Sequence, residues 1–232
     1  YTGQIEDLVK AGLLDEQTGA VPGTSSVTIT NQSANSAIAT SAIGSGGFLA
    51  SIAVAVAIVE TDGAVLARLD GDATTTNGTA DSVLVTANGQ NQAEALTIVV
   101  SISGTFSGAG AGAKAEVGTG SDVEARVGLG SVVTTEGGVI VTADAENQAD
   151  AKSYIATGGL VSAGVAVPLA TVGGTTRAES SGDIPMADDL TVTANGDYDA
   201  DAFALPISVG FIAAAGAVAQ ATITSDAGVE AH

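Results

Sequence analysis

The sequence predicts an all-β fold, a repetitive β-solenoid or stacked-strand architecture with a short N-terminal helix or arm. Three observations predict it: a short β-branched motif recurs four times, long stretches alternate with a period of two, and only 3% of the 232 residues are aromatic although 45% are hydrophobic. A core of Ala, Val and Ile needs backbones that approach closely over many repeated contacts. Stacked strands meet that requirement better than one globule centred on large side chains.

Residues 1–25 are the first expected element, and they lack the repeat. Apolar residues from Ile5 to Leu14 approximate one face at helical spacing, and Gly19 and Pro22 follow as stop signals. We expect a helical cap on the open end of the β-stack, because solenoids need protected ends. A docking arm that contacts a neighbouring subunit is the alternative.

Residues 26–232 follow as four β-repeat units, at about 27–82, 83–138, 139–189 and 190–232. Each unit opens with a four-residue strand of aliphatic residues and Thr, and these strands begin at Val27, Val83, Val139 and Leu190. The starts are 56, 56 and 51 residues apart. A second segment keeps the same register, with Ala at its third and fifth places, and it begins at Asn35, Asn91, Asn147 and Tyr198. Repetition on this scale indicates one supersecondary unit per repeat.

Each unit then enters a long uncharged stretch, at 37–59, 95–113, 153–176 and 202–225. Within 52–59 Val and Ile occupy one face and mostly Ala the other, which is the periodicity of a strand. A strand buried on both faces tolerates this mixture, whereas a half-exposed strand normally alternates with charges. We therefore expect the uncharged stretches to form the interior, with pairs such as Gly46-Gly47 marking turns.

Charge narrows the class of protein. Six basic against 26 acidic residues give a net charge of −20, which repels phosphate backbones, so we expect no nucleic-acid binding. An acidic surface suits a secreted, extracellular or cell-surface location. Tyr1 is not an initiator Met, so we expect residue 1 to be a processed end or an internal cut of a longer protein.

The uncharged stretches have about the length of a membrane span, but their composition argues against one. They are rich in Gly, Ser and Thr, they alternate with a period of two, and they lack flanking clusters of Lys or Arg. We expect the chain not to be transmembrane.

The repeat units resemble those of giant bacterial surface proteins, in particular the leukotoxin-type filamentous adhesins. Those units combine a Val-x-Val-Thr-Ala strand, an Asn-x-Ala-x-Ala segment, a Gly-rich stretch running into Val-Ala-Val, and Thr-x-Arg-Ala. The best matches here lie at 139–151, 158–167 and 175–178, and the resemblance extends over nearly all of 27–232. It implies secretion, an elongated β-solenoid-like body and a structural or adhesive role.

Candidate chemistry is sparse. The only His is His232 at the end of the chain, a poor catalytic base, so we expect no enzyme activity. Asp197, Asp199 and Asp201 alternate along an expected strand and would share one face, where their repulsion calls for solvent or a cation. Calcium suits hard carboxylate ligands, so these residues are the candidate metal site; a solvated acidic face is the alternative, and no other cofactor is expected.

Arginine recurs once in each of the first three units, at Arg68, Arg126 and Arg177. We expect these residues to stack on one side and to pair with nearby acids such as Asp70, Glu124 and Glu179.

These observations favour a non-enzymatic structural protein of the bacterial cell surface, a repeat section of an extracellular filament or adhesin. The expected partners are other copies in a fibre, neighbouring repeats of a longer chain, or a host or surface ligand. The first alternative is a discrete self-assembling filament subunit joined through residues 1–25. The second is a carbohydrate-binding or carbohydrate-active β-helix.

Overall fold

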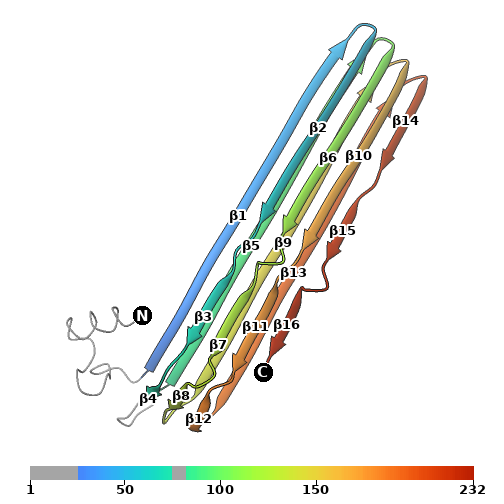
Figure 1. The fold of residues 1–232 in the computed structure, drawn as a ribbon. Helices are drawn as coiled ribbons and strands as arrows, with labels where there is room; N and C mark the ends of the chain where they lie inside the picture. Colours follow the sequence, from blue (N-terminus) through green and yellow to red (C-terminus); the bar gives the residue numbers. More distant parts are fainter. Residues whose placement is uncertain (1–25, 75–81) are drawn as a thin grey trace, which may run out of the picture.

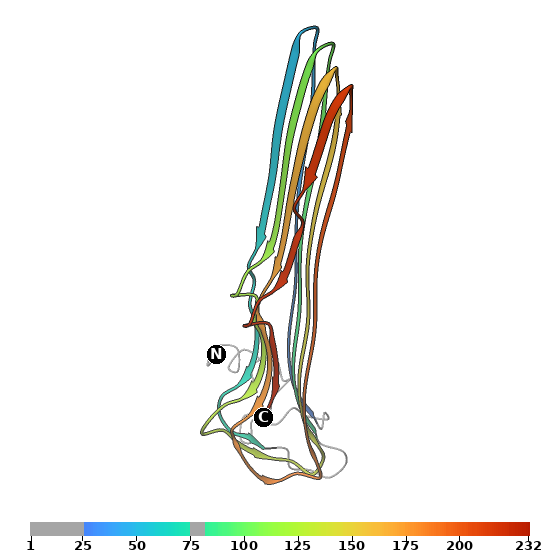
Figure 2. The ribbon, with the colours of Figure 1, turned by 90° about the vertical axis from the view of Figure 1, so that its right-hand side faces the viewer.

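The computed structural model of the protein describes residues 26–74 and 82–232, so the expected N-terminal helix or arm at 1–25 lies outside the described residues. The described residues form sixteen β-strands and no helix, and hence no helix of the length and apolar character of a membrane span. The strands build a long flat blade of two facing layers (Figures 1 and 2). The predicted all-β, repetitive stacked-strand architecture is confirmed.

The first layer is sheet A, a parallel sheet of four long strands in the order β1-β5-β9-β13. These strands are β1 (Ser26–Gly47), β5 (Ser82–Ser103), β9 (Val139–Gly158) and β13 (Leu190–Val209). At 3.3 Å per residue, the 22 residues of β1 span ~70 Å. The strand direction is therefore the long dimension of the blade.

The second layer runs back along sheet A and contains two parallel sheets in succession. Sheet B, next to the end where the chain reverses, contains β2 (Ala50–Thr61), β6 (Phe106–Val117), β10 (Val161–Val172), β14 (Ile212–Ala217) and β15 (Gln220–Ile223). Sheet C continues it with β3 (Val65–Leu69), β7 (Val123–Val127), β11 (Thr175–Ser180) and β16 (Gly228–Ala231). The small sheet D lies at the base of the blade and contains β4 (Ala73–Thr74), β8 (Val132–Thr134) and β12 (Asp183–Met186).

The register of sheet A aligns equivalent residues of successive repeats. Val27 pairs with Val83, Val83 with Val139, and Val139 with Leu190, at separations of 56, 56 and 51 residues. The separation differs elsewhere, because Val65 of β3 pairs with Val123, 58 residues later. Breaks between strands absorb these differences, so in sheets A, B and C each coil stacks on the next without a shift within the strands; in sheet D the register shifts once, between Asp183 and Met186 of β12.

The expectation that the uncharged stretches form the interior is wrong for half of their residues. Along β2 the buried side chains include Ala53, Ala55, Ala57 and Val59, whereas Ile52, Val54, Val56 and Ile58 point outward and Ile52 is 76% exposed. The physical reason is the closeness of the two layers. In this part of the blade Ala side chains of β2 fill the narrow space between the layers, and Ile52, Val54, Val56 and Ile58 are left on the outer face.

The turns at the far end of the blade, which we call the tip, are short and need close backbone contacts. Residues 48–49 join β1 to β2, and a Cβ placed on Gly47 would lie 2.2 Å from the carbonyl oxygen of Ala50. Phe48 and Phe211 are 88% and 91% exposed in the turns of the first and fourth coils. Glycine permits the reversal, and large apolar side chains occupy its outer surface.

Candidate functional site

The interior contains a ladder of asparagine side chains that links successive coils. Asn35 Nδ2 donates to Asn91 Oδ1 at 2.9 Å, and Asn91 Nδ2 donates to Asn147 Oδ1 at 3.0 Å. Asn147 Nδ2 in turn donates to the carbonyl oxygen of Gly173 at 3.0 Å. Asn91 and Asn147 are each 1% exposed. The ladder lies beside the breaks between sheets B and C, where backbone carbonyl groups need donors.

Tyr198 takes the equivalent place in the fourth coil, since it pairs with Asn147 in sheet A. Its hydroxyl is hydrogen-bonded to Thr176 Oγ1 at 2.7 Å and donates to the carbonyl oxygen of Gly228 at 3.2 Å. Burial raises the pKa of Tyr198, more than the hydrogen bond to Thr176 lowers it. The larger ring thus reaches the break in the second layer that the amides serve in the earlier coils.

A second interior ladder near the tip consists of hydroxyl groups. Ser51 Oγ lies 2.6 Å from Ser45 Oγ and 2.9 Å from Ser101 Oγ, and Ser107 donates to the carbonyl oxygen of Ser101 at 2.6 Å. Corresponding contacts in later coils join Ser208 to Ser162 at 2.7 Å and to Thr157 at 2.9 Å. Near the tip, therefore, the interior is partly polar.

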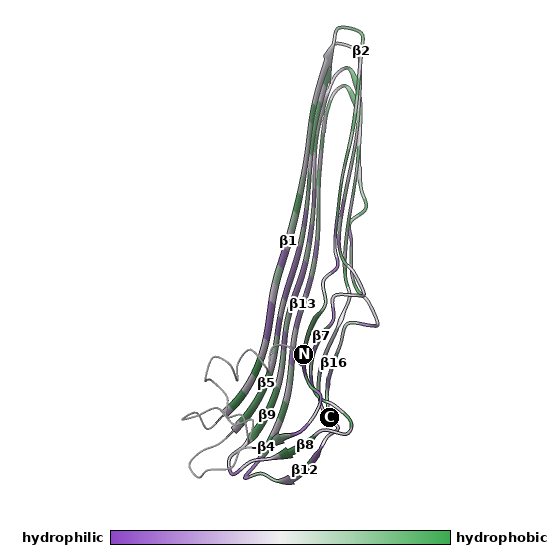
Figure 3. Ribbon diagram, turned by 60° about the vertical axis from the view of Figure 1, so that its left-hand side comes forward, coloured by the Kyte–Doolittle hydropathy of each residue, from purple (hydrophilic) through white to green (hydrophobic). Residues whose placement is uncertain are grey.

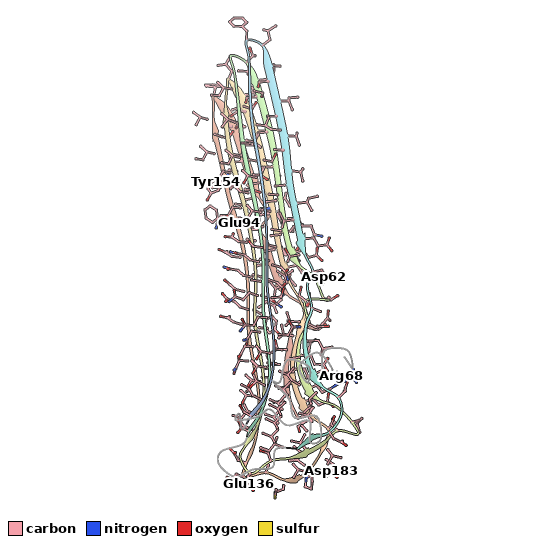
Figure 4. All side chains as sticks on the ribbon, turned by 90° about the vertical axis from the view of Figure 1, so that its left-hand side faces the viewer. Asp62, Arg68, Glu94, Glu136, Tyr154 and Asp183 are labelled. Atoms are coloured by element: carbon pink, nitrogen blue, oxygen red, sulfur yellow. The ribbon has the colours of Figure 1, made fainter. Side chains whose placement is uncertain are left out.

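The outer surface divides into two halves along the strands. Toward the tip the residues 38–59, 95–113, 153–168 and 202–218 contain no charged residue, and we call this part the distal half. Figure 3 shows the apolar colours concentrated there and in the lowest part of the blade, with hydrophilic residues between them. In Figure 4 the labelled residues Arg68, Glu136 and Asp183 lie in the lower part of the blade, Asp62 lies near its middle, and Glu94 lies higher, just below Tyr154.

The expected calcium ligands Asp197, Asp199 and Asp201 lie on the outer face of sheet A, as their alternation predicts, and we call them the acidic stripe. Asp201 is in register with Asp150, which forms an ion pair with Lys152. Lys152 Nζ also donates a hydrogen bond to Asp150, and this hydrogen bond raises the pKa of Lys152. Among the described residues no group of three or more acidic or His side chains converges to hold a metal ion. Calcium binding therefore stays a prediction, and the geometry offers a row of carboxylates with one ammonium group beside it.

A shallow trough of about 670 Å³ crosses the four strands of sheet A beside the acidic stripe. Its lining includes carboxylates and amides, and two cross-strand bonds join them: Gln90 to Glu146 at 3.2 Å and Asn195 to Asp144 at 2.7 Å. Side chains of the trough thus mainly satisfy one another between coils.

The arginine row lies on the outer face of sheet C and matches the expectation in part. Arg68 pairs with Asp70, and Arg126 lies 3.4 Å from Glu124. Arg68 and Arg126 are in register, whereas the residue in register with Arg126 in the third coil is Glu179.

Arg177 lies two residues earlier than the row requires, and it binds Glu230 at 2.6 Å, so the expected pair with Glu179 is wrong. This hydrogen bond and the charge of Arg177 hold the pKa of Glu230 below its ordinary range. His232 Nε2 lies 3.6 Å from the same carboxylate. The pair of Arg177 and Glu230 joins neighbouring coils, whereas the other pairs lie within one coil, and each of these exposed pairs contributes little.

Sequence reasoning noted the register of Asn35, Asn91 and Asn147 but assigned them no role, and it missed the hydroxyl ladder. The signal for the latter is present, because Ser45, Ser101, Thr157 and Ser208 repeat at the same spacing as the strands. No family model, curated protein or solved structure matches the chain.

Proposed function

We propose that the chain is a non-enzymatic structural section of a bacterial cell-surface filament or adhesin. The observation that carries this proposal is the in-register stacking of four coils through parallel sheets. Each coil contacts mainly its neighbours, so stability accumulates coil by coil and further coils extend the same ladders. Within the described residues β1 and β13 are paired on one side only, so each offers a strand edge to a further coil.

The interior ladders support a mechanical role. Asn, Ser and Thr side chains bond to their equivalents in the next coil rather than gathering into a site that acts on a ligand. These side-chain bonds, together with the backbone hydrogen bonds between the strands, resist separation of the coils. The part of the blade below the distal half, which we call the basal half, contains the charged residues, and they keep the surface hydrated, as a protein outside the cell requires.

Electron microscopy and fibre diffraction test the filament. We expect ribbons about 70 Å wide, the length of the long strands, with a reflection at ~4.8 Å along their axis. Antibodies against the chain should label intact cells of its source without permeabilisation. Compact particles at every concentration, together with labelling only after permeabilisation, would refute the proposal.

Deletion of residues 83–138 tests the modular stack. Residue 139 would then follow residue 82, and β9 would pair with β1 in the register that β5 has now. We expect a folded chain of lower stability that still forms ribbons, because only one nearest-neighbour interface is lost. Deletion of residues 83–110 is the control: it removes nearly all of β5 and part of β6, so that residue 111 of the second layer would follow residue 82 out of register, and this variant is expected to unfold.

A further inference from the structure

The outer face of sheet B in the distal half is an uncovered apolar surface. Val54 and Val56 of β2 are 63% and 59% exposed, and Val165 of β10 is 53% exposed. Monomeric proteins in water seldom leave contiguous apolar faces uncovered unless a partner binds there. The identity of that partner follows from the relief of the face.

Below the row nearest the tip, which consists of Ala50, Phe106, Val161 and Ile212, large and small side chains alternate from strand to strand across this face. Read from β2 to β14, successive outer rows are Ile52, Gly108, Ala163 and Ala214; then Val54, Gly110, Val165 and Gly216; then Val56, Gly112 and Val167. The strands β2 and β10 therefore form ridges, and β6 forms a groove between them. On β14 the side chains that follow the second ridge are again small.

This relief is complementary to itself. Consider two copies that face each other across sheet B and are related by a two-fold axis parallel to the strands, placed between the two faces. This axis reverses the order of the strands in the second copy and keeps their direction. It places the β10 ridge of one copy over the β6 groove of the other, and the β2 ridge over the small residues of β14. Val165 then faces the partner's Gly110, and Val54 faces the partner's Gly216. The same patch serves both copies, as an isologous dimer requires.

We propose that a second copy of this chain packs on the outer face of sheet B and pairs the distal halves with both tips pointing the same way. Four strands at ~4.8 Å and nine residues at ~3.3 Å give a flat footprint of ~570 Å² per copy, and interdigitated side chains raise the buried area toward the ~800 Å² of a standard interface. The distal half carries no charge, so repulsion between the copies comes from the basal halves alone.

A lipid surface is the competing occupant, and the sheet edges disfavour it. Within the described residues β1 and β13 pair on one side only, and hydrocarbon would leave the backbone groups of their outer edges without hydrogen-bond partners. A second copy covers the apolar side chains and leaves those edges in water. Pairing occurs at right angles to the stacking of coils, so it goes beyond the proposed function and does not depend on it.

The test is Gly110→Val, which fills the groove. A Cβ at Gly110 would lie 3.7 Å from Val54 methyl groups, an ordinary contact, so the fold accommodates the new side chain. Sedimentation equilibrium in 0.5 M NaCl, which screens the basal charges, should show a dimer whose dissociation constant rises at least ~10-fold in the variant. The melting temperature should not fall. Gly44→Val is the matched control, since it makes the same change on the outer face of sheet A, where a Cβ meets nothing within 4 Å, and it should leave pairing unchanged.

The direction of the effect separates the occupants. A non-specific apolar face gains area from Gly110→Val, so association of that kind would become tighter, as would flotation with phosphatidylcholine vesicles. Tighter or unchanged pairing, a monomer at ~100 μM in high salt, or vesicle binding without dimers would each overturn the inference. Ribbons that are only one blade thick would refute pairing but leave the proposed function intact. Dimers that never form ribbons would support pairing but refute the proposed function.

Discussion

Substitution of Asn91 by Ala tests whether the asparagine ladder holds the coils together. The change removes the acceptor of Asn35 Nδ2 at 2.9 Å and the donor to Asn147 Oδ1 at 3.0 Å. Asn147 is 1% exposed, so its oxygen would lose a partner where water cannot replace it. A buried polar group without a partner costs about 1–3 kcal/mol, and the partly buried Asn35 adds about 1 kcal/mol. We expect a total loss of about 2–4 kcal/mol in the free energy of unfolding.

The assay is equilibrium unfolding in urea, followed by circular dichroism, with Gln92→Ala as control. Gln92 is the next residue on β5, and its side chain is exposed on the opposite face, so we expect a change within about 0.5 kcal/mol. Coincident unfolding midpoints for the two variants would show that the ladder contributes nothing.

Asn91→Asp refines the same test. The carboxylate keeps the shape and the acceptor for Asn35, but it cannot donate to Asn147. Burial favours the protonated form, which can donate, so the stability relative to the native chain should be highest in acid and fall as the pH rises above about 4. A deficit that does not depend on pH would contradict this account of the ladder.

Three further predictions concern titratable groups. Tyr198→Phe should lower the free energy of unfolding by about 1–2 kcal/mol, because it leaves the buried Thr176 hydroxyl without its partner. Since the pKa of Tyr198 is raised, the native chain should keep the stabilisation from Tyr198 below pH 10 and lose it as the pH rises above 10. An absorbance titration at 295 nm would show the raised pKa. The Glu230 carboxyl should titrate below its ordinary pKa in an NMR experiment. Its stabilisation is present above the ordinary pKa and is lost as the pH falls through the lowered pKa, and Arg177→Gln should raise the midpoint toward the ordinary value. For the acidic stripe we expect calcium and magnesium to raise the melting temperature equally; a saturable calorimetric signal for calcium alone would instead establish the site.

The repeat predicted which residues lie side by side, because parallel stacking with one register brings equivalent positions together. It could not predict which face of each strand is inside. Period-two alternation defines two faces, but in residues 52–59 both faces are apolar, so hydropathy does not distinguish them. The choice depends on the distance between the layers, which admits Ala53 and Ala55 and places Val54 and Val56 outside.

The Arg177 pairing escaped prediction for a related reason. Aligning the units by arginine ignores the breaks, and the break between β10 and β11 is shorter than that between β6 and β7. The register instead aligns Ala67, Ala125 and Ala178, whose side chains are buried. Burial of a small side chain determines the register, and the exposed charge then takes whichever partner is near.

The direction of stacking determines how much sequence each unit of length consumes. One coil of about 56 residues could span ~185 Å if fully extended, yet it advances the stack by only ~4.8 Å. The remainder of its length is folded back across the blade, where it covers a strip ~70 Å wide on each side. A chain organised in this way gains little length for each residue, so it is poorly suited to bridging distance. It is suited to covering an area, because every added coil extends a continuous surface that is charged near the base and uncharged near the tip.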